Sequence, residues 1–397
     1  MRTTAEVVIV GGGCMGASVA YHLARRGVTA VVLLEREALL ATGSTGRNAG
    51  GVRHQFSHPS NIALSIESIR CLERFEDEVG ATIDFHQDGY LFLLSSDGSV
   101  REFEAAVAEQ RRLGVDVRWL GAEAARELAP GLDVAGVIAA TYCARDGIAD
   151  PNGVTMGFAR AAQAAGVEIR RETEAVAIRT AGQRIVGVET TRGHIDAPIV
   201  VNAAGPWAGG VGRLAGVDLP VNPLRRHIFI AQPPSERGWF SPDTDGRARP
   251  VAPANRLMVI DFDTSFYFHR EGANLLFGMG DPNEPYGFDT TVRWDLLPDV
   301  VETAVRRLPV LADCAVSHAW AGLYEMTPDA MPLVGAVRSL PGFYVIAGFS
   351  GHGFQHSPAA GRVLADVVAG VDPAFDLSPF APERFSTGTP HGERHFV

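Results

Sequence analysis

Three glycines near the start of the chain have the spacing of a phosphate-binding turn. Gly11, Gly13 and Gly16 form G-x-G-x-x-G directly after the apolar, β-branched run at residues 6–10. In such a turn the first glycine allows a tight bend, the second lets the backbone approach a pyrophosphate, and the third lets helix and strand pack closely. The helix predicted from residue 17 to 26 would attract phosphate charge at its N-terminus.

An acidic residue completes this unit. Residues 30–34 predict a second buried strand that ends at Glu35, close to the expected spacing of about 20 residues after the last glycine. A carboxylate there accepts hydrogen bonds from a ribose diol and disfavours a 2′-phosphate. The order of strand, glycines, helix, strand and acid predicts a dinucleotide site.

The basic residues are equally informative, because all 35 are arginine and the chain contains no lysine. This composition excludes a pyridoxal phosphate Schiff base, a phosphate-loop lysine and a lysine nucleophile. The net charge of −11 argues against a general nucleic-acid or anionic-membrane binder.

The remaining composition is typical of a cytoplasmic protein. The four cysteines are scattered without a C-x-x-C pair, which indicates reduced thiols rather than a disulfide framework or a zinc site. No apolar run approaches the roughly 18 residues of a membrane span. The first strand begins too early to leave room for a signal peptide.

The elements that must position these residues fall into two groups. Between about residues 225 and 325 the chain is richer in proline and aromatic residues, which predicts an antiparallel sheet forming a separate unit. The tail from residue 385 is polar and is expected to be loosely held. We predict strands at 89–94, 167–170, 175–180, 184–190, 199–203, 227–231, 265–269, 275–278 and 343–347, and helices at 59–79, 100–113, 152–165 and 357–369.

Several motifs together point to a known family. They are V-G-G-G-C-M-G at 10–16 with Glu35, G-S-T-G-R-N-A-G-G-V-R at 43–53, V-N-A-A-G-P-W at 201–207, T-P-D at 327–329 and A-G-F-S-G-H-G-F at 347–354. The chain resembles the D-amino-acid oxidase superfamily of FAD enzymes, nearest the sarcosine oxidase, glycine oxidase and proline dehydrogenase β-subunit branch.

The resemblance implies a fold of the α/β class, α+β overall. A discontinuous Rossmann-like FAD-binding domain (residues 1–88, 145–224 and 326–384) would be interleaved with an antiparallel-sheet substrate domain. The substrate domain would comprise residues 89–144 and 225–325, leaving 385–397 as a tail.

The resemblance also implies where FAD lies. Glu35 would hold the adenosine ribose, Val176 would meet the adenine, and the loop at 43–46 would run beside the pyrophosphate and flavin. The turn at 348–354 precedes a helix whose N-terminus would stabilise negative charge near flavin N1 after reduction. The implied FAD-binding residues are Gly11, Gly13, Cys14, Met15, Gly16, Glu35, Arg36, Gly43, Ser44, Thr45, Asn48, Ala49, Gly50, Gly51, Val176, Ala203, Ala204, Gly205, Trp207, Gly322, Gly348, Ser350, Gly351, His352, Gly353, Phe354 and Gln355.

Arg53 is the expected carboxylate clamp, because sarcosine-oxidase-like members place an arginine at the end of this loop and a guanidinium suits a two-pronged contact. A salt bridge to a nearby acid is the alternative role. The other candidate catalytic residues are His54, Tyr267, His269, Arg270, His352 and Gln355. His54 is equally consistent with a structural histidine, and strand alternation lets only some residues between 267 and 270 face a pocket.

Two features depart from the family. Gln355 stands where sarcosine oxidases carry a lysine that helps to hold the carboxylate. The cysteine that links flavin covalently in the family has no counterpart near residues 324–327, which favours non-covalent FAD.

Two other chemistries fit poorly. His54 and His58, and likewise His352 and His356, are four positions apart, but neither pair has the H-E-x-x-H form, so we expect no metal. The run Gly348 to His352 lacks the final glycine of a hydrolase nucleophile elbow.

The predicted reaction is oxidation of the C–N bond of a small primary or secondary amino acid to an imine, with hydride transfer to flavin N5 and hydrolysis in water. The amine must be neutral, so the pocket must lower its pKa by exclusion of water. Oxidation of a C–O bond, as in 2-hydroxyacid dehydrogenases, is an alternative. An electron-transferring subunit of a hetero-oligomer is another, and a homo-oligomer is left open.

Oxygen or a quinone or other electron-transfer acceptor would reoxidise the flavin. Sarcosine-oxidase-like enzymes speed the oxygen reaction with a lysine near N5, which this chain lacks. We expect a slower oxygen reaction unless an arginine or a protonated histidine, His352 or His54, takes that place.

The first prediction concerns the cofactor. The purified protein is expected to be yellow, and acid precipitation is expected to release FAD into the supernatant, measured by absorbance and chromatography. A colourless protein that FAD cannot reconstitute contradicts the dinucleotide assignment. Flavin that stays in the pellet contradicts only the non-covalent attachment.

Overall fold

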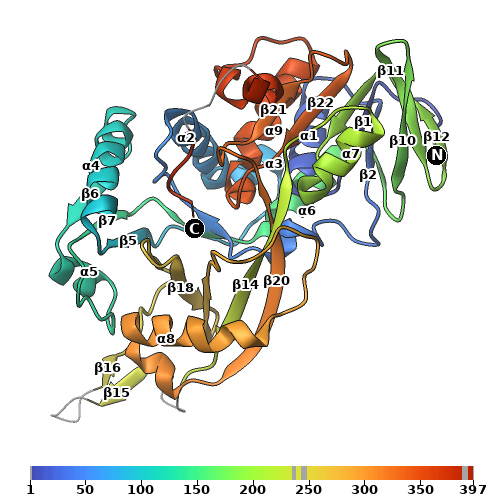
Figure 1. Cartoon of the computed structure of the whole chain (residues 1–397). Helices are drawn as coiled ribbons and strands as arrows, with labels where there is room; N and C mark the ends of the chain where they lie inside the picture. Colours follow the sequence, from blue (N-terminus) through green and yellow to red (C-terminus); the bar gives the residue numbers. More distant parts are fainter. Residues whose placement is uncertain (1, 235–237, 243–247, 387–391, 397) are drawn as a thin grey trace.

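The computed structural model, which describes residues 2–234, 238–242, 248–386 and 392–396, contains a six-stranded sheet in the order β21-β22-β13-β1-β2-β9 (Figure 1). β1 (Val7–Val10) lies at its centre and pairs in parallel with β2 (Val31–Leu34) and β13 (Ile199–Asn202). These strands are continuous apolar runs because both faces of the sheet are covered. β9 (Glu168–Arg170) and β22 (Phe343–Ala347) extend the sheet in parallel, and β21 (Leu333–Ala336) is antiparallel.

Alternation along β1 divides its side chains between two hydrophobic cores. Val7 and Ile9 pack among α1 (Cys14–Arg25), α6 (Pro151–Ala164) and α9 (Gly353–Val368). Val8 and Val10 face the opposite core. That core is covered by α7 (Ala208–Leu214) and by the three-stranded sheet of β10 (Ala175–Ala181), β11 (Arg184–Thr190) and β12 (Gly193–Asp196).

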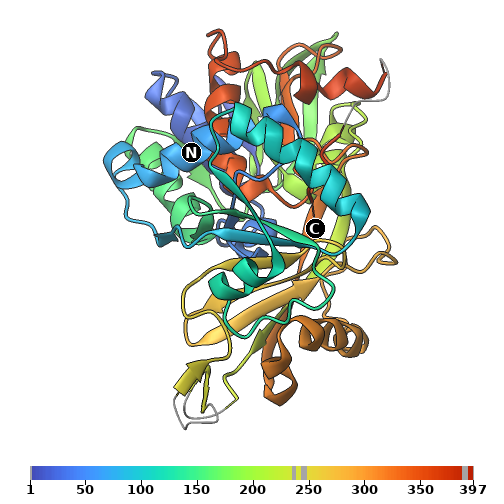
Figure 2. The same ribbon diagram turned by 90° about the vertical axis from the view of Figure 1, so that its left-hand side faces the viewer.

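The second large sheet has eight strands in the order β20-β14-β19-β18-β17-β5-β7-β6. In both views its blue-green strands lie against the yellow and orange ones (Figures 1 and 2). The predicted antiparallel sheet is present, and one neighbouring pair in it, β17 and β5, runs parallel. Its strands are β5 (Tyr90–Leu94), β6 (Val117–Leu120), β7 (Ala139–Cys143), β14 (Asn222–Ala231), β17 (Met258–Asp261), β18 (Phe266–Glu271), β19 (Asn274–Met279) and β20 (Val316–Met326).

Shorter elements complete the described chain. They are β3 (Gly51–Val52), β4 (Phe85–His86) and β8 (Gly147–Ala149), which form a small sheet, β15 (Phe240–Pro242) with β16 (Ala248–Pro250), and the helices α2 (Pro59–Glu73), α3 (Phe75–Val79), α4 (Asp97–Arg112), α5 (Ala122–Leu128) and α8 (Leu297–Arg307). Within the described ranges, no helix combines the length and apolar character that a membrane span requires.

The predicted α/β class is confirmed, and most predicted elements form at the expected places. The region 59–79 is two helices, because the chain breaks at Arg74. α9 begins at Gly353 rather than at 357, directly after the turn in which Gly351 has a φ of 98°. The boundaries of the two interleaved domains stay a prediction.

The crossing of α1 and α9 generates a prediction about stability. A Cβ added at Gly361 would lie 2.6 Å from Ser18 Cβ and 3.1 Å from its carbonyl carbon. Gly361→Ala is therefore expected to lower the free energy of unfolding by about 1–3 kcal/mol, measured by urea denaturation. Gly98→Ala in α4 is the matched control, because its Cβ would meet only Ser96 Oγ at 3.6 Å. Equal stability of both variants and the native protein contradicts the close packing.

Candidate active site

A cavity of about 860 Å³ is lined by residues from both large sheets. Its volume lies within the range of sites that enclose small molecules and cofactors. One end is formed by the glycine turn and Glu35, and the other by side chains of β5, β14, β18 and β20. A dinucleotide site and a second chamber are thus continuous.

The glycine turn has no room for side chains at Gly11 and Gly16, where it packs against neighbouring backbone. Gly11 has a φ of 116°, and a Cβ there would lie 2.7 Å from the carbonyl carbon of Ala203. A Cβ at Gly16 would overlap the carbonyl oxygen of Gly11. α1 begins after Gly13 without a cap from the Gly13 position; the N–H of Cys14 donates to Thr45 Oγ1 at 3.2 Å, and the following N–H groups of the first turn are available to an anion.

Glu35 ends β2 at the cavity wall. Its Oε2 accepts from Gly12 N at 2.9 Å and its Oε1 from Glu37 N at 2.9 Å. Each carboxylate oxygen has a second lone pair, so the group can still accept from ribose hydroxyls. The uncapped helix, the glycine turn and this acid fit the adenosine diphosphate part of FAD.

One part of the nucleotide half carries aromatic rings and a cation. The guanidinium of Arg36 lies 4.0 Å from the Trp207 ring, and the Phe288 ring stacks with Trp207 at a centroid distance of 5.8 Å. Val176 also lines the cavity and is 47% exposed.

The turn before α9, at residues 350–352, also borders the cavity. Ser350 and Gly351 have positive φ angles, and α9 then starts without a side-chain cap at His352. The helix N-terminus therefore presents free N–H groups beside the cavity, as expected for a partner of negative charge on a reduced flavin.

Most of the predicted residues line this cavity together. They are Gly11, Gly13, Cys14, Met15, Glu35, Arg36, Gly43, Ser44, Thr45, Asn48, Ala49, Gly51, Arg53, Val176, Ala203, Ala204, Gly205, Trp207, Tyr267, Gly322, Ser350, Gly351, His352, Gly353, Phe354 and Gln355. Of the other FAD candidates, Gly16, Gly50 and Gly348 lie behind the wall, where a Cβ would meet backbone or Thr327. We therefore assign them to packing of the wall.

The chamber at the far end has three tyrosines, Tyr90, Tyr267 and Tyr324. Burial raises the pKa of each phenol, so all three are neutral at physiological pH. Within the described part of the chain, no hydrogen-bond partner of their hydroxyls is present. They offer neutral donors to a ligand in an environment of low polarity.

Arg53 follows β3 and is only 6% exposed. Its guanidinium donates to the carbonyl oxygens of Gln55 and His395 and stacks 3.8 Å from the Phe56 ring. Burial lowers its pKa. Among the described residues it forms no salt bridge, so the alternative role as an ion-pair partner is not supported.

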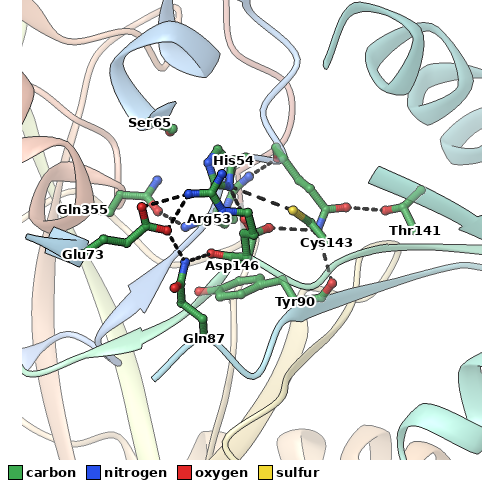
Figure 3. A network of polar contacts seen from close by, with 12 residues as sticks. Arg53, His54, Ser65, Glu73, Gln87, Tyr90, Thr141, Cys143, Asp146 and Gln355 are labelled. Atoms are coloured by element: carbon green, nitrogen blue, oxygen red, sulfur yellow. Dashed lines mark hydrogen bonds and ion pairs between the residues drawn. The ribbon is translucent and has the colours of Figure 1, made fainter. Parts of the chain in front are cut away.

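His54 belongs to the network that holds the Arg53 loop rather than to the cavity wall (Figure 3). Its N and Nδ1 both lie against Asp146 Oδ1, at 2.8 and 2.6 Å. Gln55 Nε2 donates to the other oxygen of Asp146 at 3.1 Å. The structure therefore places His54 in a hydrogen-bond network behind the cavity lining, which favours the structural role over the catalytic one.

The same network contains a set of metal-binding side-chain types, His54, Cys143 and Asp146. Burial raises the pKa of the Cys143 thiol, so the sulfur is protonated, and Asp146 already accepts from three N–H groups. A metal ion would have to displace these bonds.

Strand alternation puts Tyr267 and His269 on one face of β18 and Arg270 on the other. Tyr267 lines the cavity, whereas His269 is fully buried outside the lining, with its Nδ1 2.8 Å from the carbonyl oxygen of Arg270. Arg270 packs 5.0 Å from the Trp239 ring in the core on the other face. His269 and Arg270 are therefore not part of the chamber.

His352 lines the cavity as a neutral residue. Burial lowers its pKa to about 4, and its two ring nitrogens lie 3.2 Å from Ala330 O and from His356 Nδ1. It therefore cannot supply the positive charge that the missing lysine would carry. Gln355 Oε1 accepts from Arg53 N at 2.7 Å, and its Nε2 has no partner among the described residues.

The sequence did not indicate Glu325 as a site residue, although it lies in the segment 324–327, near which the family carries its flavin-linking cysteine. Burial raises the pKa of Glu325 to about 7, against the effect of N–H groups of Gly348 and Phe349, and its Oε2 has no partner in the described structure. It lines the cavity on β20. Alternation along the strand at 322–326 could have placed Glu325 on one face of the sheet, but it does not say which face borders the cavity.

The tail from 385, which we expected to be loosely held, is docked over residues 392–396. Glu393 Oε1 accepts from Ser57 N and Ser57 Oγ, and Oε2 from His58 N and Asn61 Nδ2, all within 3.1 Å. The His395 ring stacks 3.8 Å from Phe103, and Phe396 lines the cavity. The carboxylate sits at the N-terminus of α2, where unpaired N–H groups favour it.

The fold and this site together define a dinucleotide-dependent oxidoreductase with an enclosed substrate chamber. The family model for FAD-dependent oxidoreductases, DAO, matches residues 6–367, and the chain belongs to this family.

Known proteins of similar sequence and structure agree with this family. Over 98% of its length the chain is 31% identical to dimethylglycine dehydrogenase of Rattus norvegicus, of which it covers 46%. Over 96% it is 30% identical to sarcosine oxidase subunit beta of an Arthrobacter species, of which it covers 91%. The structure of L-proline dehydrogenase from P. horikoshii superposes with a TM-score of 0.88 at 31% identity, covering 98% of this chain and 100% of that one. The chain thus spans less than half the length of the dimethylglycine dehydrogenases.

The docked tail yields a prediction. Burial acts to raise the pKa of Glu393, but His395 and the hydrogen bonds from Ser57 and Asn61 bring it to about 2, below the ordinary 4.5. The carboxylate therefore stabilises docking above pH 4.5, and this stabilisation is lost as the pH falls toward 2. Hydrogen exchange of residues 392–396, corrected for the intrinsic pH effect, is expected to rise over that interval.

The matching variant is Glu393→Gln. This variant loses charge-assisted hydrogen bonds that stabilise the docked tail by about 1–3 kcal/mol. Trypsin cleavage after Arg394 at pH 8 is therefore expected to become at least fivefold faster. Glu302→Gln on the exposed face of α8 is the control. Unchanged cleavage in Glu393→Gln contradicts the anchoring role.

Proposed function

We propose that this protein oxidises the C–N bond of a small primary or secondary amino acid, with FAD as the electron acceptor. The supporting observation is a buried chamber with Arg53 and three neutral tyrosines, continuous with a cradle that fits FAD. The names of the relatives, which act on N-methylated glycines and proline, support the substrate class.

The chain's own residues would bind and orient the substrate. Arg53 would take the carboxylate with the N–H groups that its two carbonyl partners leave available. Bound FAD supplies the hydride acceptor. The apolar walls and the neutral tyrosines exclude water, which favours the uncharged amine needed for hydride loss.

The second half of the reaction passes electrons from the reduced flavin to an acceptor. Within the described residues His352 is neutral and His54 lies outside the lining, so neither histidine replaces the missing lysine. Arg53 and Arg226 are cations in the lining, and we propose that both serve the substrate rather than the oxygen reaction. We propose an acceptor other than oxygen, a quinone or an electron-transfer protein. The likeness to a subunit of sarcosine oxidase supports a hetero-oligomer.

The reaction class is tested by mixing the holoenzyme anaerobically with primary amino acids, N-methyl amino acids, proline and 2-hydroxyacids. Bleaching of the flavin absorbance by an amino acid is the expected result. Bleaching by hydroxyacids alone favours C–O oxidation. No bleaching by any member, in protein that binds FAD, contradicts the proposal.

Arg53 provides the residue-level prediction. Arg53→Met is expected to raise KM by roughly 30-fold to several thousand-fold, because a charge-assisted pair of about 2–5 kcal/mol is lost, while the FAD content stays at the native level. Arg306→Met on the exposed surface of α8 is the matched control. Normal KM values in Arg53→Met place the carboxylate anchor elsewhere.

A further inference from the structure

Arg226 is a second arginine of the chamber, next to an arginine with a different role. On β14, Arg225 points away from the cavity and bonds Glu284 at 2.8 Å and the carbonyl of Thr291 at 2.9 Å. Arg226 points to the opposite face and lines the cavity. Adjacent strand residues alternate in this way, so one arginine is structural and the other is free to meet a ligand.

The guanidinium of Arg226 is poorly satisfied. Its one recorded hydrogen bond, from Nη1 to the carbonyl of Arg225, is 3.5 Å long, and its Nε is buried without a partner in the described structure. No acidic side chain of the described residues lies within ion-pair distance of it. Arg226 is half-buried, and a buried N–H group without a partner is costly, so such donors are normally paired or bound to a ligand.

Two neighbours border the guanidinium of Arg226 at the chamber wall. Its Cζ lies 5.3 Å from the ring of Tyr324, and Gly280 leaves space on another side, since a Cβ there would lie 3.6 Å from Cζ. The donors of Arg226 therefore stay available to a ligand.

Arg53 acts on the same chamber from the loop that follows β3. Burial raises the pKa of the Tyr324 phenol, and the positive charges of Arg226 and Arg53 act to lower it. Tyr324 therefore lies close to both guanidinium groups. Asp146 and Glu393 partly offset the charge of Arg53, although each is bonded to other groups. The charge of Arg226 is not offset in this way.

We propose that Arg226 binds a second acidic group of the substrate, so that the chamber takes amino acids with two carboxylates, one at Arg53 and the other at Arg226. This inference rests on the proposed amino-acid oxidation. A dianionic ligand would neutralise both cations and satisfy the open donors of Arg226. Guanidinium geometry suits a two-pronged carboxylate contact at each end.

The test uses the oxidised FAD holoenzyme and two ethers that cannot be oxidised at a C–N bond. Diglycolate carries a carboxylate at both ends, and methoxyacetate carries one. Binding is measured by the change in flavin absorbance on titration. Diglycolate is expected to bind about tenfold or more tightly than methoxyacetate.

Variants assign the second carboxylate to Arg226. Arg226→Gln is expected to bring the two affinities within about threefold of each other while retaining FAD and methoxyacetate binding, and Arg226→Lys to restore part of the preference as a point charge. Arg306→Gln is the control and is expected to keep the native ratio. FAD content and near-UV circular dichroism verify that each variant is folded.

Three results overturn the inference. Equal binding of both ethers by the native enzyme, or an unchanged ratio of the two affinities in Arg226→Gln, contradicts a site for a second carboxylate at Arg226. If amino acids with one carboxylate still bleach the flavin in those cases, the proposed oxidation stands and only this inference fails. If neither ether binds and no amino acid bleaches the flavin, both fail together.

Discussion

The carboxylate of Asp146 is the contact on which the substrate end of the molecule depends. It lies just before β8 and accepts from both His54 and Gln55, which fixes the backbone between them and Arg53. Gln55 in turn donates to the carbonyl of Tyr90 and accepts from Thr141 in the second sheet. One buried acid therefore joins the glycine-rich loop of the nucleotide half to the strands that form the chamber, and the position of Arg53 follows from that junction.

The nucleotide half could be predicted because its signals are local. The glycine spacing, β1, α1 and Glu35 lie within about one βαβ unit, and each residue has one physical reason for its place. The chamber is different, since Tyr90, Arg226 and Tyr324 lie on β5, β14 and β20, three strands far apart in the sequence. Nothing in the pair Arg225 and Arg226 indicates which one faces the cavity until the register of β14 is known.

Misplaced candidates have a common cause. His54 and His269 are buried with a hydrogen bond to a neighbouring group, and Arg270 packs beside Trp239, so none of these three reactive residue types lines the cavity. Conversely, the docking of residues 392–396 depends on one buried carboxylate, Glu393, which meets the start of α2 only after more than 300 intervening residues have folded. Single-residue contacts at such separations leave no periodic pattern in a sequence.

The docked tail has a practical consequence for handling the protein. Phe396 borders the cavity and His395 contributes a carbonyl to Arg53, so an affinity tag attached behind them would emerge directly from the wall of the chamber. The beginning of the chain offers a better place, since Arg2 is exposed and hydrogen-bonds Glu168 and the carbonyls of Thr29 and Gly166. With a tag at residue 397, the measured kcat and KM would include any disturbance of the chamber by the tag.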